Sequence, residues 1–232
     1  MARLPRLSFG GMPHHAMLLS ASGGVAFRND EDYLFFLECL AAAAAGACVA
    51  VNAYLLMPHR VHLALTPEDS AGLSSMLQCL SRRYVRWFNR KYRHSGTLWS
   101  GRFLSCVVDP AWELECWRYI EEIPVRERVV SAADQFVWSS FSHHAGMRSD
   151  YFLADTVAYL SLGNCPQDRQ AAYRDRFLAA PGEGFRCRIE SATRRGKPLG
   201  SEAFINGLPA YENRKKWPLA RGRPPRAAAG MK

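Results

Sequence analysis

The sequence predicts an α+β fold in which an antiparallel sheet carries helices on one face. Short apolar runs of strand length alternate along the chain with longer segments of helical periodicity. Two of the apolar runs are separated by only a few residues around Pro58, as expected for a hairpin of adjacent antiparallel strands. Of the 232 residues 48% are hydrophobic, which is enough for one sizeable domain and a smaller appendage and excludes disorder throughout.

The first elements are a strand, a helix and a hairpin. The short apolar segment 14–20 is consistent with a first strand. Asn29 can cap a helix that runs to about Gly46, because three acidic residues follow in the first turn and apolar residues recur at helical spacing. The apolar runs 49–57 and 61–66 each end before a proline and predict the two strands of the hairpin.

The next elements are a long helix, a strand and a third helix. Apolar residues at helical spacing from Leu73 to Phe88 mark the buried stripe of the long helix, and 103–108 reads as a fourth strand. Asp109 before Pro110 predicts a helix start; this helix runs to about Ile123 and is limited by the following proline. This order of elements predicts a split βαβ, ferredoxin-like arrangement.

The C-terminal part differs in composition. From about Tyr151 the pattern is one of helical pieces broken by Gly and Pro, without a convincing strand. We therefore expect a domain over 1–146, a helical C-terminal region over 147–212 and a basic, disordered tail over 213–232.

Positive charge is concentrated in two places. Residues 181–232 hold twelve Lys or Arg and four Asp or Glu, which accounts for +8 of the net charge of +9. In the remaining chain the segment 74–93 has six basic residues and no acidic one. A polyanion such as DNA is the natural partner of such a surface, although a solvated helix face is an equally good interpretation of a charge run. The candidate DNA-binding residues are Arg82, Arg86, Arg90 and Arg93 on the long helix, with Arg221 and Arg223 in a tail suited to non-specific duplex binding.

Several classes of protein are excluded by composition. The longest uncharged apolar run, 40–51, is shorter than the roughly 20 residues that cross a bilayer, and the N-terminal residues do not resemble a secretory signal. The seven cysteines form no Cys-x-x-Cys pair and indicate neither a disulfide framework nor a zinc site. We expect a cytoplasmic protein with no membrane contact.

Few side chains are candidates for catalysis or for metal binding. Arg60 and His62 share one face of their strand, whereas His59 lies on the other, so no His-x-His metal pair exists there. A lone histidine such as His62 is more often a hydrogen-bonded structural residue than a metal ligand, and Tyr119 on its apolar stripe reads first as a core tyrosine. The doublets at 14–15 and 143–144 are interpreted as structural or surface groups.

Six segments in order nevertheless resemble one known family. They are Met57-Pro58-x-x-Val61-His62-Leu63, Arg83-Tyr84-Val85-Arg86-x-Phe88-Asn89, Gly96-Thr97-Leu98-Trp99-x-Gly101-Arg102-Phe103, Arg118-Tyr119-Ile120-Glu121, Pro124-Val125-Arg126 and Trp138-Ser139-Ser140-Phe141. Over about 13–146 the chain is similar to the REP-associated tyrosine transposases, relatives of the IS200/IS605 single-tyrosine HUH transposases.

The resemblance implies a fold, a reaction and partners. The family has the ferredoxin-like sheet, acts on single-stranded or hairpin DNA, and forms homodimers. By resemblance a divalent metal, Mg²⁺ or Mn²⁺, polarises a scissile phosphate, and a tyrosine attacks it to give a 5′-phosphotyrosine link and a free 3′-hydroxyl. Tyr119 occupies the position of the nucleophile and His62 that of the second histidine of the metal motif.

The chain departs from the family at two metal-ligand positions. The first motif histidine is replaced by Arg60, which cannot deprotonate and ligate a cation. The position four residues after Tyr119, which is usually Asn in the family, is Ile123, whose side chain has no atom that can bind a metal. Glu122, on the same helix, could in principle replace it as a metal ligand. The segment 20–22 also lacks the usual Arg-Gly-Asn. The metal site is therefore expected to be degraded or lost.

Two hypotheses of different class follow. In the first, the chain is a transposase-like enzyme that binds single-stranded or hairpin DNA and retains a reduced nicking site. In the second, it is a catalytically inactive DNA-binding or regulatory protein that has kept the transposase fold. A third interpretation is that the protein is the product of a mobile-element gene in decay. Whether the protein binds a metal distinguishes the first two hypotheses.

Overall fold

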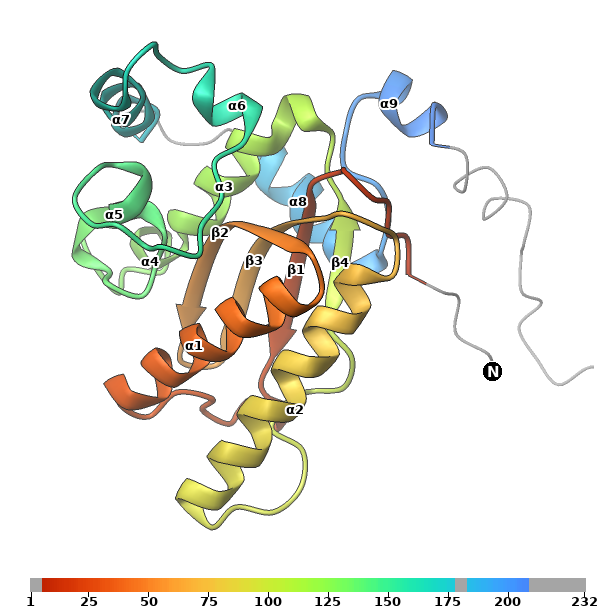
Figure 1. Ribbon diagram of the computed structural model, residues 1–232, viewed down its shortest axis with the longest axis vertical. Helices are drawn as coiled ribbons and strands as arrows, with labels where there is room; N and C mark the ends of the chain where they lie inside the picture. The colour runs from red at the N-terminus through yellow and green to blue at the C-terminus, as the bar shows by residue number, and fades with distance from the viewer. Residues whose placement is uncertain (1–5, 178–182, 209–232) are drawn as a thin grey trace, which may run out of the picture.

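Four strands form one antiparallel sheet in the order β2-β3-β1-β4 (Figure 1). The computed structural model describes residues 6–177 and 183–208. The strands are β1 (His14–Leu19), β2 (Val49–Met57), β3 (Arg60–Pro67) and β4 (Leu104–Val107), within a residue or two of the predicted bounds. The predicted α+β, split βαβ arrangement is confirmed, and β1 lies at the centre between β3 and β4.

Two long helices, α1 (Asp30–Gly46) and α2 (Gly72–Tyr92), lie side by side on one face of the sheet (Figure 1). The predicted cap is present: the Asn29 side chain accepts a hydrogen bond from the Asp32 amide, and the Asp32 side chain accepts one from the Asn29 amide. The apolar stripe of α2 faces the sheet, as the sequence predicted, and its buried members are Leu73, Met76, Leu77, Leu80, Tyr84 and Phe88.

The opposite face of the sheet is covered too, which the prediction of helices on one face did not include. There α3 (Glu113–Glu121) packs on β2 and β3, and α8 (Glu183–Arg195) packs on β4 and β1. The reason lies in the strands, whose buried residues point to both faces: Tyr54 and Leu56 join the core under α1 and α2, and Leu55 joins the core under α3. Strands that are apolar on both faces need cover on both.

The predicted third helix is divided into three pieces. A 3₁₀ turn over Pro110–Trp112 begins after Asp109, whose side chain accepts a hydrogen bond from the Ala111 amide, and α3 and α4 (Ile123–Arg126) follow. The proline does not stop the helical course where the sequence predicted, because Pro124 lies in the first turn of α4, where no backbone N–H is needed. Tyr119 and Ile123 therefore remain on neighbouring turns.

Further short helices follow α4: α5 (Phe141–His144) within the expected domain over 1–146, and α6 (Val157–Leu160), α7 (Pro166–Asp175), α8 and α9 (Glu202–Asn206) in the C-terminal region. Tyr159, Tyr173 and Ile189 from these helices share the core under α3. Leu199, after α8, exchanges backbone hydrogen bonds with Val107 and Asp109, next to β4. The predicted tail over 213–232 lies outside the described residues. Over the described ranges, no helix combines the length and apolar character that crossing a bilayer requires.

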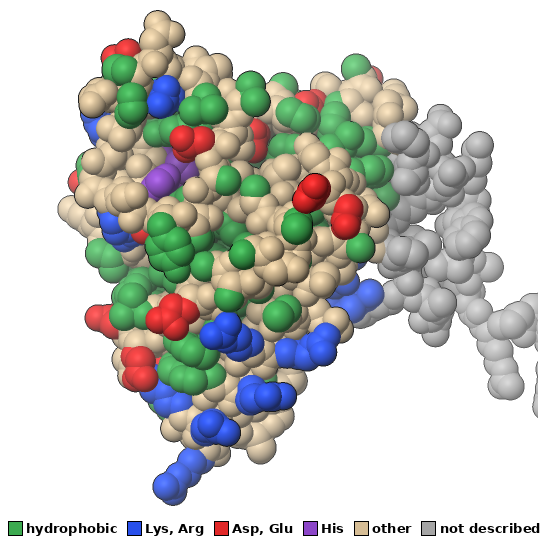
Figure 2. Space-filling model, in the orientation of Figure 1, with side chains coloured by type: hydrophobic (Ala, Val, Ile, Leu, Met, Phe, Trp, Pro, Cys, Tyr) green, Lys and Arg blue, Asp and Glu red, His purple; other side chains and the backbone are tan. Residues whose placement is uncertain are grey.

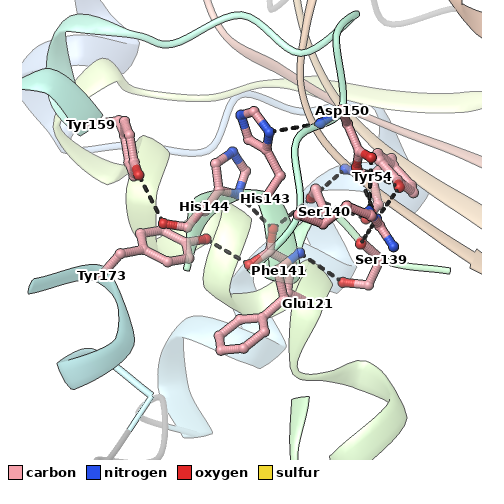
Figure 3. A network of polar contacts seen from close by, with 11 residues as sticks. Tyr54, Glu121, Ser139, Ser140, Phe141, His143, His144, Asp150, Tyr159 and Tyr173 are labelled. Atoms are coloured by element: carbon pink, nitrogen blue, oxygen red, sulfur yellow. Dashed lines mark hydrogen bonds and ion pairs between the residues drawn. The ribbon is translucent and has the colours of Figure 1, made fainter. Parts of the chain in front are cut away.

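A buried polar network ties α3 to α5 and α7 (Figure 3). Glu121 is fully buried and accepts hydrogen bonds from Ser140 Oγ at 2.5 Å and Tyr173 Oη at 2.7 Å, while His144 Nδ1 lies 2.9 Å from the same carboxylate. Buried carboxylates are tolerated only when they are paired in this way. The network holds the C-terminal end of α3, two residues from Tyr119, against the rest of the fold.

Tyr173→Phe should lower the free energy of unfolding by about 1.5–3 kcal/mol, because it removes one hydrogen bond to a buried carboxylate. Urea unfolding measures this loss. Tyr151→Phe, at a position with 85% of its surface exposed, is the matched control and should change the stability by less than about 0.5 kcal/mol. Equal stability of the two variants would show that the network does not stabilise the fold.

Candidate active site

A cavity of about 240 Å³ opens where β1, β3, the α3–α4 segment and α8 meet. Its walls bring together residues far apart in the sequence. They are His15, Met17, Leu19, Arg60, His62, Tyr119, Ile123, Arg126, Glu127, Glu190, Thr193 and Arg194. This one cavity is therefore lined by four of the positions compared in the transposase resemblance, Arg60, His62, Tyr119 and Ile123.

Two histidines and a threonine form a chain of hydrogen bonds in its wall. His15 Nδ1 lies 2.7 Å from Thr193 Oγ1, and His15 Nε2 lies 3.0 Å from His62 Nδ1. The two imidazole rings are nearly parallel, with centroids 5.2 Å apart. The register of β1 and β3 explains why the two histidines are in contact. Met17 is opposite His62, and His15, two residues before Met17, projects from the same face of the sheet as His62.

Tyr119 lies against both histidines. Its ring is 6.0 Å from that of His15 and 6.3 Å from that of His62, each in an edge-on arrangement, and its hydroxyl donates to Glu190 Oε1 at 3.4 Å. Burial and then the Glu190 carboxylate raise the pKa of the Tyr119 phenol, and nearby Arg126 opposes the rise. The phenol therefore stays protonated at neutral pH, and a protonated phenol is a weak nucleophile.

Three arginines surround the histidine pair. The guanidinium of Arg126 lies 4.8 Å from the centroid of the Tyr119 ring, and Arg60 forms an ion pair with Glu127. Burial, and then His15, Arg60, Arg126 and Arg194, lower the pKa of His62 well below its usual range. His62 is therefore neutral, in a cavity whose other charged groups are mostly cationic.

Glu122 is not part of this cavity. Its carboxylate accepts a hydrogen bond from Arg118 Nε at 2.8 Å, and it lines a different, larger cavity of about 710 Å³ between α4 and α5. Burial raises the pKa of Glu122, and Arg118 opposes the rise. The structure therefore does not bring Glu122 to His62.

The donor set does not fit a divalent cation. His15 and His62 direct one nitrogen each toward the other, Ile123 has no donor, and Arg60 carries a fixed positive charge. Mg²⁺ and Mn²⁺ prefer carboxylate, carbonyl and water oxygens. In the described part of the chain no group of three or more His, Cys, Asp or Glu side chains is placed to hold a metal ion.

The predicted cationic face of α2 is exposed. Arg82, Arg86, Arg90 and Arg93 all lie at the surface, and Figure 2 shows Lys and Arg side chains gathered where α2 runs. Lys91 differs from them, since it pairs with Glu31 and Asp32 of α1. None of the four arginines forms an ion pair with a described residue. Arg221 and Arg223, the predicted tail contacts, lie outside the described ranges.

Several polar residues of the cavity were given no site role from the sequence: His15, Arg126, Glu127, Glu190, Thr193 and Arg194. His15 was interpreted as structural or surface, although strand alternation beside His62 was a signal that could have placed it. Glu190, Thr193 and Arg194 come from α8. No pattern in the sequence indicates that this helix closes the site.

The buried histidines should make stability depend on pH. Burial lowers the pKa of His15 to about 3 and that of His14 to about 4, both below the value of about 6.5 in the unfolded chain. The unfolded state then binds more protons below pH 6.5, so stability is full above that pH and falls on acidification. We expect a loss of about 2 kcal/mol per histidine between pH 7 and pH 5.

Urea unfolding at the two pH values measures this loss. His15→Gln should reduce the difference between pH 7 and pH 5 by about 2 kcal/mol. His59→Gln, at an exposed position, should leave the difference unchanged. An equal pH dependence in the His15 variant and the natural chain would contradict the expectation.

Comparison with known proteins identifies a solved structure with a similar fold. No family model matches the chain, and no curated protein is similar to it in sequence. A solved structure of a REP-associated tyrosine transposase bound to a REP hairpin, however, matches 68% of this chain and 99% of its own, with a TM-score of 0.54 and 13% identity. The chain has the fold of this transposase. A candidate transposase from Deinococcus radiodurans also matches, over 53% of this chain and 94% of its own at 20% identity, but its TM-score of 0.36 is too low to support a shared fold.

The match to the REP-associated tyrosine transposase confirms the fold that the resemblance implied. At 13% identity it assigns no role to any residue. The roles of Tyr119, His62 and the arginines rest on the cavity alone.

Proposed function

We propose that the chain is a transposase-like protein that binds single-stranded or hairpin DNA. The observation that carries the proposal is the cavity itself, which Tyr119 lines together with His62, Arg60, Arg126 and Arg194. A tyrosine in cationic surroundings suits a DNA backbone phosphate. The exposed arginines of α2, and the likeness in fold to a transposase bound to a REP hairpin, support the same partner.

The reaction that fits Tyr119 is transesterification. Its phenolic oxygen would bond to phosphorus, the bond from phosphorus to the 3′-oxygen would break, and the phenol proton would be transferred to that oxygen. The products are a 5′-phosphotyrosine and a free 3′-hydroxyl. The raised pKa of Tyr119 and the poor fit to a metal oppose this step, so we propose that cleavage by the natural chain is very weak.

The alternative, a DNA-binding or regulatory protein without catalysis, is favoured by a specific observation. Arg60, at a metal-ligand position of the resemblance, is held by an ion pair with Glu127. A guanidinium fixed in this way can contact phosphate and has no part in metal catalysis. In this alternative DNA affinity is retained and no covalent adduct forms.

One experiment tests the proposal and separates the alternatives. The full chain is titrated with a labelled hairpin, a single strand and a duplex of matched composition, and each is then incubated with Mn²⁺ under single-turnover conditions. We expect tighter binding of the hairpin or single strand than of the duplex, with at most a trace of adduct. Equal affinity for all three DNAs would overturn the proposed partner, and rapid formation of a Tyr119 adduct would show that the site is intact.

A further inference from the structure

Three buried nitrogen atoms of the cavity residues have no hydrogen-bond partner among the described residues. They are His62 Nε2, Arg60 Nε and Arg126 Nη1. His62 itself has only 3% of its surface exposed. Buried polar groups are nearly always paired, so three unpaired nitrogens on residues that line one cavity point to a missing ligand.

The chemistry of the arginines identifies the kind of ligand. A guanidinium has only donors, so Arg60 Nε and Arg126 Nη1 each lack an acceptor. Among the charged residues of the cavity wall, Arg60, Arg126 and Arg194 face two carboxylates, Glu127 and Glu190. These five side chains together give the wall one net positive charge. The ligand is therefore an acceptor and an anion.

The hydrogen-bond chain allows His62 to serve as a third donor without being charged. If the Thr193 hydroxyl donates to His15 Nδ1, His15 Nε2–H donates to His62 Nδ1, and the proton of His62 lies on Nε2. Cys106 Sγ, 3.3 Å from Thr193 Oγ1, can donate to the hydroxyl at the start of this chain. With the protons placed in this way, every donor in this series of hydrogen bonds has an acceptor except His62 Nε2–H.

We propose that the cavity is a phosphate site that works without a metal, in which Arg60, Arg126 and His62 Nε2–H donate to the oxygens of a DNA backbone phosphate. His15 and Thr193 are positioning residues, which set the tautomer of His62. The cavity of about 240 Å³ has room for a tetrahedral oxyanion, since one water takes up about 30 Å³. The inference rests on the proposed function, and it replaces the metal of the resemblance with a set of fixed donors.

Binding of inorganic phosphate to the full chain, in the presence of a chelator, tests the site directly. We expect Arg126→Gln to weaken phosphate binding by about tenfold to hundredfold, because a charge-assisted hydrogen bond is lost. Glu190→Gln should strengthen binding by about tenfold, because it removes a carboxylate from the cavity wall. Arg195→Gln, next to the cavity but not in its wall, is the control and should bind as the natural chain does.

The role of the positioning residues has its own readout. Ring nitrogen NMR of His62 should show the neutral tautomer with the proton on Nε2 when phosphate is bound, and Thr193→Val should lose this preference and bind phosphate several-fold more weakly. Thr66→Val, on the same strand as His62 but outside the cavity wall, should change neither measurement. Circular dichroism establishes that each variant is folded.

The outcomes separate this inference from the proposed function. Phosphate binding that needs Mn²⁺, or that survives Arg126→Gln unchanged, would overturn the phosphate site. Failure to bind any hairpin or single strand, with phosphate binding intact, would overturn the proposed function and leave the site standing. Hairpin binding without phosphate binding would overturn the phosphate site and leave the proposed function standing.

Discussion

The double variant Arg60→His, Ile123→Asn should show much faster metal-dependent nicking than the natural chain. Both positions line the cavity that holds Tyr119 and His62, so an imidazole and an amide would enter it at the places of two missing ligands. A bound divalent metal stabilises the charge that develops on a phosphate by several kcal/mol, so we expect cleavage to rise by at least about 100-fold. The loss of Arg60 leaves Glu127 without its partner at an exposed position, where the effect on stability is small.

Single-turnover cleavage of a labelled hairpin with Mn²⁺ measures the gain, and a denaturing gel detects the covalent adduct. Tyr119→Phe in the double variant should abolish both, because it removes the attacking oxygen. Arg60→His with Ile123→Leu is the matched control, since it restores only one ligand and should remain much slower. If the natural chain cleaves as fast as the double variant, the expectation that its metal site is degraded is wrong.

The same double variant bears on the phosphate site. Arg60→His removes one of the proposed donors, so metal-free binding of inorganic phosphate should weaken as metal-dependent cleavage appears. The two activities are expected to change in opposite directions because the cation and the phosphate donors compete for one cavity.

Replacement of Arg82, Arg86, Arg90 and Arg93 by Gln should weaken hairpin binding by about two orders of magnitude at 0.1 M salt. The four side chains are exposed along α2 and near its end, and none is paired with a described acidic residue. Each phosphate contact with single-stranded DNA contributes about 0.7 to the slope of log affinity against log salt, so four contacts contribute about 2.8. The variant should therefore show a much flatter salt dependence.

Titration of the hairpin between 50 and 200 mM salt measures the slope. Replacement of the same four arginines by Lys keeps the charge and should keep the slope, which makes it the matched control. Thermal unfolding should be nearly the same in all three proteins, because exposed side chains contribute little to stability. A slope that does not change in the Gln variant would show that this helix face is solvated and touches no DNA.

Local signals were sufficient to predict most of the fold. The N-cap Asn29 begins α1, Asp109 begins the helical segment that carries Tyr119, and the apolar runs of β2 and β3 fall within one residue of their bounds. These features depend on interactions within a few residues along the chain, such as capping and strand alternation. For the same reason the sequence placed Arg60 and His62 on one strand face and Ile123 one helical turn from Tyr119.

Tertiary structure alone decided how the site is closed and what it can hold. His15 meets Thr193 across 178 positions in the sequence, and the fit of α8 against β4 and β1 brings Glu190, Thr193 and Arg194 to the Tyr119 cavity. No local pattern records such a contact, because it depends on how two apolar surfaces pack after both have formed. The sequence by itself therefore determined the sheet, the two long helices and the presence of Arg60 and Ile123 where the resemblance expects metal ligands. Packing across the sheet determined which residues share the cavity with Tyr119, among them residues with unpaired arginine and histidine nitrogens.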